Sequence, residues 1–96
     1  MNNIDLDPVI HAPNRLQICA FLSPLEMAEF QLLRDHLGVS DSVLSKHISK
    51  LEQAGYLKQK KHKVGARQRT SLYLTKEGQT AYKNHIAALE AIINGN

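Results

Sequence analysis

FQLLRDHLGVSDSVLSKHISKLEQAGYLKQKK, residues 30–61, contains two amphipathic helical patterns joined by the short segment GVS. In the first pattern, apolar residues recur at intervals of three and four until Gly38, which can end a helix because glycine adopts a left-handed backbone without penalty. In the second, Ser40 is a suitable N-cap and Asp41 suits the positive end of the helix dipole. Two helices joined by so short a turn indicate a helix-turn-helix, although many small helical domains contain such a corner.

The outer face of the second helix is rich in small hydroxyls and cations. Its inward stripe is Leu44, Ile48 and Leu51. At about 100° per residue, the opposite side collects Ser, Lys and Gln, and its only nearby acid, Glu52, lies on the flank. Short hydroxyls let a helix approach base edges closely, and Lys reaches a guanine edge or a phosphate. A routine solvated face is the alternative, but such a face usually mixes both signs of charge. The residues on this face are Ser42, Ser45, Lys46, Ser49, Lys50 and Gln53.

A basic segment, KQKKHKVGARQRTSLYL at residues 58–74, holds six Lys or Arg and no acid. Residues 45–69 carry a net charge of +7, from eight Lys or Arg against Glu52 alone, while the rest of the chain carries −4 from four cations and eight acids. Two β-like runs flank Gly65, which permits a tight hairpin tip. So localised a positive field favours a polyanion, most commonly a nucleic acid backbone, although charge alone is equally compatible with a solvated basic loop.

One further helix is expected before the helix-turn-helix, and the start of the first helix of that pair is also predicted. Pro13 opens a helix over about residues 13–22, because proline is tolerated in the first turn. The residues Ser23, Pro24 and Glu26 then have the spacing of a capping box, which predicts that the next helix begins at Pro24 and continues to Gly38.

The composition is that of one globular domain of 96 residues with 43% apolar content. We expect a loose arm over residues 1–7 and a C-terminal helix over residues 76–94, capped by Thr75. No apolar run approaches the roughly 20 residues of a membrane span, and the N-terminus lacks a signal-peptide pattern. The single cysteine, Cys19, excludes an internal disulfide and fits a reducing compartment.

Three motifs together resemble the short MarR-type winged-helix transcriptional regulators, with the ArsR type as a near neighbour. They are H-x-P-x-R-L-x-I at His11–Ile18, S-x-L-S-K-H-I-x-x-L-E-x-A-G-Y-L at Ser42–Leu57 and L-T-x-x-G at Leu74–Gly78. The resemblance covers about residues 11–82, and the combination of motifs is specific.

This resemblance implies an α+β, mostly helical winged helix-turn-helix with three helices, a two-stranded β-hairpin wing and a C-terminal helix. It also implies a cytoplasmic dimer, associated with the nucleoid when bound, that binds double-stranded DNA in a sequence-specific manner and regulates transcription. By position, the DNA-binding residues would be Ser42, Ser45, Lys46, Ser49 and Lys50 in the groove and Lys61, Lys63, Arg67 and Arg69 in the wing. Full-length MarR proteins add long helices at both ends, so a small-molecule effector is unsupported by this shorter chain.

The C-terminal helix carries a candidate dimer contact. Tyr82, Ile86, Leu89 and Ile93 follow a 4-3-4 spacing like that of a coiled-coil seam. The alternative is that this helix only covers the core of its own domain. A two-fold homodimer predicts a pseudo-palindromic DNA site with half-sites about one helical turn apart.

Other functions have weaker support in the sequence. Five histidines never lie with Cys19 at metal-ligand spacing, so we expect no metal and no other cofactor. The position of His47 beside the apolar stripe favours a packing or phosphate-contacting role, and the apolar neighbours of Cys19 predict an inert core thiol. We find no paired nucleophile and base, and therefore no indication of an enzyme. The alternative function is a winged-helix protein-interaction module within a larger complex.

Overall fold

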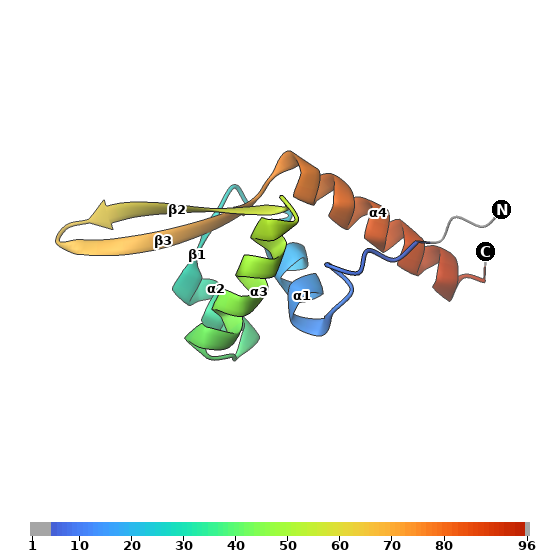
Figure 1. The fold of residues 1–96 in the computed structure, drawn as a ribbon, viewed down its shortest axis with the longest axis horizontal. Helices are drawn as coiled ribbons and strands as arrows, with labels where there is room; N and C mark the ends of the chain where they lie inside the picture. The colour runs from blue at the N-terminus through green and yellow to red at the C-terminus, as the bar shows by residue number, and fades with distance from the viewer. Residues whose placement is uncertain (1–4, 96) are drawn as a thin grey trace.

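The computed structural model describes residues 5–95, which form a helical body with a long β-hairpin on one side and a long helix on the other (Figure 1). The elements are α1 (Pro13–Leu22), β1 (Ala28–Glu29), α2 (Phe30–Leu37), α3 (Asp41–Gln53), β2 (Leu57–Val64), β3 (Arg67–Leu74) and α4 (Lys76–Ile93). The three shorter helices lie on one side of the base of the hairpin. This arrangement confirms the expected winged helix.

Two of the predicted helix starts are confirmed by their capping contacts. The Oγ of Ser40 accepts a hydrogen bond from the N–H of Val43 at the start of α3. The Oγ1 of Thr75 accepts one from the N–H of Gly78 at the start of α4. The first of the two helix-turn-helix segments ends where expected, since Gly38 adopts a left-handed backbone with φ of 68°. Local sequence signals are therefore sufficient to place the starts of α3 and α4 and the end of α2.

The predicted start of the second helix at Pro24 is wrong, because α2 begins only at Phe30. Ser23 is instead the C-cap of α1, and its Oγ donates a hydrogen bond to the Oε1 of Gln79 in α4. Ala28 and Glu29 form β1, which pairs with β3 and makes the sheet three-stranded, in the order β1-β3-β2. The wing therefore extends a three-stranded sheet rather than standing as an isolated two-stranded hairpin. The backbone groups at the free edge of β3 need hydrogen-bond partners, and residues 28–29 supply them as a strand instead of continuing a helix from Pro24. A capping-box spacing carries no information about this distant pairing.

The core lies between the helices and one face of the sheet. The predicted inward stripe of α3 is confirmed, since Leu44, Ile48 and Leu51 are all buried. They meet buried leucines of the sheet, including Leu72. Cys19 is also buried in this core, and burial is the main cause that raises the pKa of its thiol to about 12. The thiol is therefore protonated at neutral pH, as expected for an inert core residue.

The N-terminal segment departs from the expected loose arm over residues 1–7. Residues 1–4 lie outside the described part of the chain. Asp7 is held in place, because its Oδ1 accepts hydrogen bonds from the N–H groups of Val9 and Ile10. Ile10 is fully buried in the core. The segment from Asp7 onward is thus an integral part of the domain.

The C-terminal helix contacts the body of the domain through residues of its first half and middle. Gly78, His85 and Ala88 are its buried residues. Tyr82 is partly buried against the core, whereas Ile93 is 79% exposed. Within the candidate dimer contact, Tyr82 therefore packs against the core of its own domain, while Ile93 lies on the free surface. Within residues 5–95, no helix combines the length and apolar character needed to cross a membrane.

Candidate nucleic-acid interface

The outer face of α3 is open to solvent along its whole length. All of the predicted groove residues are exposed, namely Ser42, Ser45, Lys46, Ser49 and Lys50. They lie opposite the buried stripe that anchors α3 to the core. Because the buried and exposed faces are separate, the exposed side chains can approach a partner without disturbing the packing.

Arg34 of α2 spans the turn between α2 and α3, a contact that sequence reasoning missed. Its NH1 donates to the Oδ1 of Asp41 over 2.9 Å, and its Nε donates to Asp35. These hydrogen bonds, first to Asp41 and then to Asp35, raise the pKa of the guanidinium. The cation therefore offsets the charge of Asp41, the one acid in the first turn of α3, beside the exposed face.

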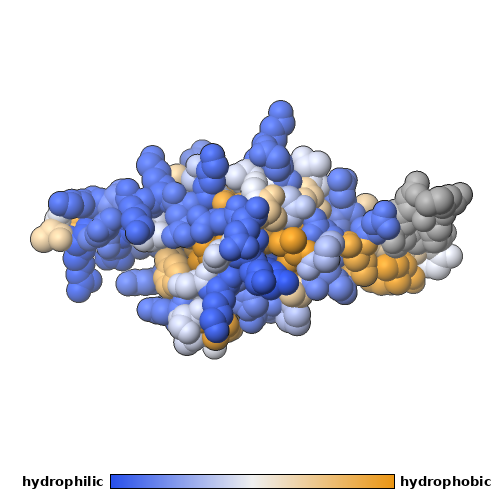
Figure 2. Space-filling model, viewed as in Figure 1, coloured by the Kyte–Doolittle hydropathy of each residue, from blue (hydrophilic) through white to orange (hydrophobic). Residues whose placement is uncertain are grey.

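The strand register divides the wing cations between two faces. Residues paired across an antiparallel ladder share a face, and successive residues alternate. Lys61 and Lys63 share the face of the buried Leu57, which packs toward the helices. Arg67 and Arg69 share the opposite face. Figure 2 shows hydrophilic groups covering the wing, and the turn at its tip is permitted by Gly65, whose φ is 63°.

Arg69 differs from the other three predicted wing cations. Its NH1 lies 2.9 Å from the Oε2 of Glu29 in β1, and its side chain is 29% exposed. By contrast, Lys61, Lys63 and Arg67 are exposed. The ion pair between Arg69 and Glu29 joins the wing to the segment that leads into α2.

His47 packs against α1 rather than pointing out from α3. The NH1 of Arg15 lies 3.3 Å from its Nδ1, and the Nδ2 of Asn14 lies 3.2 Å from its Nε2. A guanidinium only donates hydrogen bonds, so Nδ1 is the acceptor and carries no proton. Burial, and then the charge of Arg15, lower the pKa of His47. Of the two roles expected for this residue, packing is the one that the structure supports.

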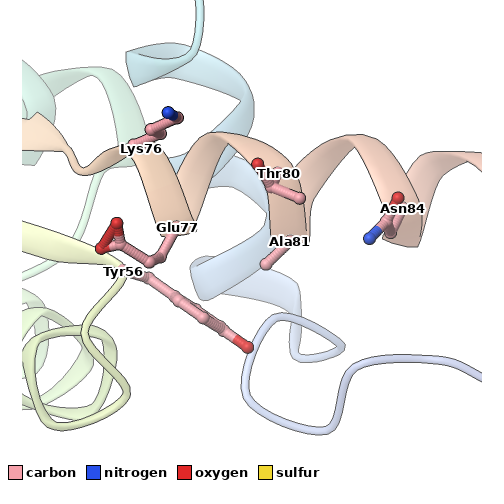
Figure 3. Close-up of a pocket in the computed structure, with 6 residues that line it drawn as sticks. All are labelled: Tyr56, Lys76, Glu77, Thr80, Ala81 and Asn84. Atoms are coloured by element: carbon pink, nitrogen blue, oxygen red, sulfur yellow. The ribbon is translucent and has the colours of Figure 1, made fainter.

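Two adjoining pockets lie along α4, away from the predicted groove residues. One of about 400 Å³ is lined by Tyr56, Lys76, Glu77, Thr80, Ala81 and Asn84 (Figure 3). The other, of about 430 Å³, shares Tyr56, Ala81 and Asn84 and is completed by His85 and residues 5–9. Across the described residues, no group of three His, Cys, Asp or Glu side chains is placed to hold a metal ion.

A helix-turn-helix with lysines on its exposed second helix, followed by a cationic β-hairpin, is typical of the winged-helix class of DNA-binding domains. Residues 14–93 match the winged helix DNA-binding domain family, and the chain belongs to that family. The family and fold are those of DNA-binding transcriptional regulators and not of enzymes. The expected resemblance to winged-helix transcriptional regulators is thereby confirmed.

Similar proteins span most of the chain. A transcriptional regulator homologue from Pyrococcus horikoshii OT3 is 32% identical with a TM-score of 0.85, over 91% of this chain and 86% of that one. The uncharacterised protein MJ0432 of Methanocaldococcus jannaschii is 38% identical over 72 residues, which are 75% of this chain and 78% of that protein. The putative transcriptional regulator ytfH of Salmonella typhimurium, 24% identical with a TM-score of 0.74 over 88% of this chain and 74% of that one, shares the fold.

Proposed function

We propose that the protein is a cytoplasmic, sequence-specific regulator of transcription that binds double-stranded DNA as a homodimer on a pseudo-palindromic site. The observation that carries this proposal is the exposed face of α3 opposite its buried stripe. Hydroxyls and lysines gather on this face, the exposed acids Asp41 and Glu52 lie only at its edge, and the cationic wing follows directly. An α-helix fits the major groove, where base edges carry a code that side chains can read.

The groove contacts are assigned to the exposed face of α3. Lys46 and Lys50 are long enough to reach a guanine edge or a phosphate, while Ser42, Ser45 and Ser49 allow the helix to sit close to the bases. The pairing of Asp41 with Arg34 supports this assignment, because it offsets the nearest negative charge at the start of the helix.

The wing contacts are assigned to Lys61, Lys63 and Arg67. Cations on both faces of a narrow ribbon suit a groove, in which each face meets one of two phosphate backbones. The negative potential of a narrow minor groove also attracts arginine near the tip. A ribbon with all its cations on one face would instead suit a flat contact along one backbone.

Arg69 is proposed to position the wing rather than to neutralise a phosphate, because Glu29 already offsets its charge. We expect Arg69→Gln to lower DNA affinity while leaving the dependence of log affinity on log salt unchanged, since each phosphate contact contributes a slope of about 0.9. Affinity would be measured across a salt series by fluorescence anisotropy. Glu29→Gln is the matched control and should lower affinity in the same way. A slope that falls by about one in Arg69→Gln alone would instead assign Arg69 to a phosphate.

The dimer contact is assigned to the outer end of α4. Ile92 and Ile93 are 49% and 79% exposed, and Ile86 and Leu89 continue the apolar side of the helix. Figure 2 shows apolar surface gathered toward this end of the molecule. Tyr82 contributes less than its spacing suggests, because it packs partly against its own core. A second copy of the chain would remove this surface from water.

Ile93→Asp is expected to dissociate the dimer. Burying an isoleucine contributes about 1.5–3 kcal/mol, and a two-fold interface contains the residue twice, so the dimer should weaken by at least roughly 100-fold. Sedimentation equilibrium of both proteins measures this change. Val64→Asp changes an apolar side chain that is 55% exposed at the wing tip, and should leave the mass unchanged. A wild-type mass of one chain at all concentrations would refute the dimer.

The proposed function is tested by selecting bound duplexes from a random pool. We expect a recovered consensus with two inverted half-sites about one helical turn apart. Recovery of unrelated sequences would contradict sequence-specific binding. Capture of an acidic protein without any mobility shift of DNA would favour the interaction-module alternative.

A further inference from the structure

A partly buried hydrogen-bonded cluster lies outside the proposed DNA interface. It joins three separate parts of the chain: Asp7 in the N-terminal segment, Tyr56 in the turn after α3 and His85 in α4. His85 is only 1% exposed, although it lies on a helix that is otherwise open at its end. Figure 3 shows Tyr56 extending below α4 with its hydroxyl turned toward the N-terminal segment.

Asp7 is the centre of this cluster. Its backbone N–H donates to the Nδ1 of His85 over 3.0 Å. Its Oδ2 accepts a hydrogen bond of 2.7 Å from the hydroxyl of Tyr56. Because its Oδ1 already accepts from the N–H groups of Val9 and Ile10, both carboxylate oxygens are engaged. The cluster thus links the end of α3, through Tyr56 and Asp7, to the middle of α4.

The hydrogen bond at Nδ1 requires a neutral His85. Nδ1 accepts from the Asp7 N–H, so the ring proton is on Nε2, which lies 3.4 Å from the Nδ1 of His11. A protonated imidazole carries a proton on both nitrogens. The new Nδ1–H would then face the Asp7 N–H, and two donors cannot bond to each other. Protonation of His85 therefore breaks the hydrogen bond between the Asp7 N–H and its Nδ1, which joins α4 to the N-terminal segment.

The surroundings oppose protonation at neutral pH. Burial, and then His11, lower the pKa of His85, against an opposing effect of Asp7. Burial acts to raise the pKa of Asp7, but hydrogen bonds from Tyr56, Ile10 and Val9 lower it overall, so Asp7 stays ionised as His85 titrates. The hydrogen bond from the Tyr56 hydroxyl to Asp7, and then burial, raise the pKa of Tyr56 to about 12. Cys19 of α1 makes a smaller contribution in the same direction. His85 is therefore the group of this cluster whose lowered pKa makes it gain a proton only as the pH falls below the ordinary histidine value.

The sign of the pH dependence follows from the direction of the His85 shift. The folded-state pKa lies below the ordinary value of 6.5, so the unfolded chain binds more protons as the pH falls. The stability that the neutral cluster contributes is complete above the ordinary value. It is lost progressively as the pH falls below that value and through the lowered pKa.

We propose that Asp7 and His85 form an acid-sensitive latch, which holds α4 in a set orientation to the DNA-reading helix and opens when His85 is protonated. The consequence for DNA binding rests on the proposed function, in which α4 pairs two copies and so sets the spacing of the two α3 helices. An open latch leaves that spacing undetermined. Only the latched fraction then binds DNA fully, so affinity falls about tenfold when nine molecules in ten are open.

The latch itself is tested by hydrogen exchange of the Asp7 amide in the wild-type protein. Its protection factor, relative to an unstructured peptide at each pH, is expected to fall as the pH is lowered from about 7.5, through the ordinary histidine value, to about 4.5. His85→Asn is the matched variant, because its amide oxygen can take the place of Nδ1 and does not titrate. Protection in His85→Asn should stay constant over the same range. Constant protection of Asp7 in the wild-type protein overturns the latch, whether or not the variant folds.

The coupling to DNA is tested by measuring affinity for the selected duplex over the same pH range at fixed ionic strength. Acid adds positive charge to both proteins and strengthens DNA binding generally, so the informative quantity is the ratio of wild-type to His85→Asn affinity. This ratio is expected to fall by about tenfold toward acid pH. A constant ratio with a normally opening latch overturns the coupling. Absence of DNA binding by both proteins at every pH overturns the proposed function while leaving the exchange result intact.

Discussion

Lys46→Ala is expected to weaken binding to the selected duplex by about 1–3 kcal/mol, or roughly 5- to 150-fold, and to relax the choice of base at one position in each half-site. The reason is geometric: Lys46 projects from the exposed face of α3, opposite the buried Leu44 and Leu51 that anchor the helix. A base contact is lost only from duplexes that carry the preferred base. Competition binding against a set of single-base variants of the duplex measures this effect.

Arg67→Ala provides the comparison that distinguishes a contact to a base from a contact to the phosphate backbone. This exposed wing residue is expected to weaken binding to all duplexes about equally and to reduce the salt slope by about one. Gln68→Ala, an uncharged neighbour on β3, controls for disturbance of the hairpin and should change neither quantity. If Lys46→Ala weakened all duplexes equally, Lys46 would be a backbone contact and the assignment of α3 as the reading helix would be wrong.

Gly78→Ala is expected to destabilise the protein by about 1–3 kcal/mol or more, although the same change within a helix normally stabilises by up to about 1 kcal/mol. The first turn of α4 crosses the start of β2 so closely that a Cβ at Gly78 would overlap the backbone carbonyl of Tyr56. That carbonyl also accepts a hydrogen bond from the N–H of Thr75, so it is not free to move. Urea unfolding followed by circular dichroism measures the change.

Thr80→Ala is the control for this substitution. Thr80 lies on an exposed side of the same helix, so alanine there should raise stability by a few tenths of a kcal/mol through helix propensity alone. Equal or greater stability of Gly78→Ala relative to the wild type would show that α4 can shift away from β2. The close approach would then not determine the position of α4.

Predictions based on local patterns succeeded where one stretch of chain contains the whole physical cause. The caps at Ser40 and Thr75 depend on a side chain and an N–H three residues away. The exposed face of α3 follows from helical periodicity, and Gly38 ends α2 by its own backbone freedom. The start of α2 failed because the capping-box spacing after Ser23 competed with the pairing of Ala28 to β3, which is distant in sequence.

Sequence reasoning did not identify His85 as a buried residue, because His85 is polar and lies beside Ile86, which belongs to the candidate dimer contact. A signal was present, since it lies three residues after Tyr82 and three before Ala88, the spacing of one helix face. Periodicity identified an apolar band on α4 but not which part of it meets the body of the domain. The contact partners settle that question, and they come from the N-terminal segment.

The amino-acid order alone was enough to establish the helix-turn-helix, the basic hairpin and the side chains on the exposed face of α3, because these follow from caps, glycine stops and periodicity over a few residues. Folding in three dimensions added β1, the pairing of Arg69 with Glu29 and the cluster around Asp7. Those features join residues separated by 40 positions for Arg69 and Glu29 and 78 for Asp7 and His85. A contact over such a separation depends on how whole elements pack, and no local pattern encodes that.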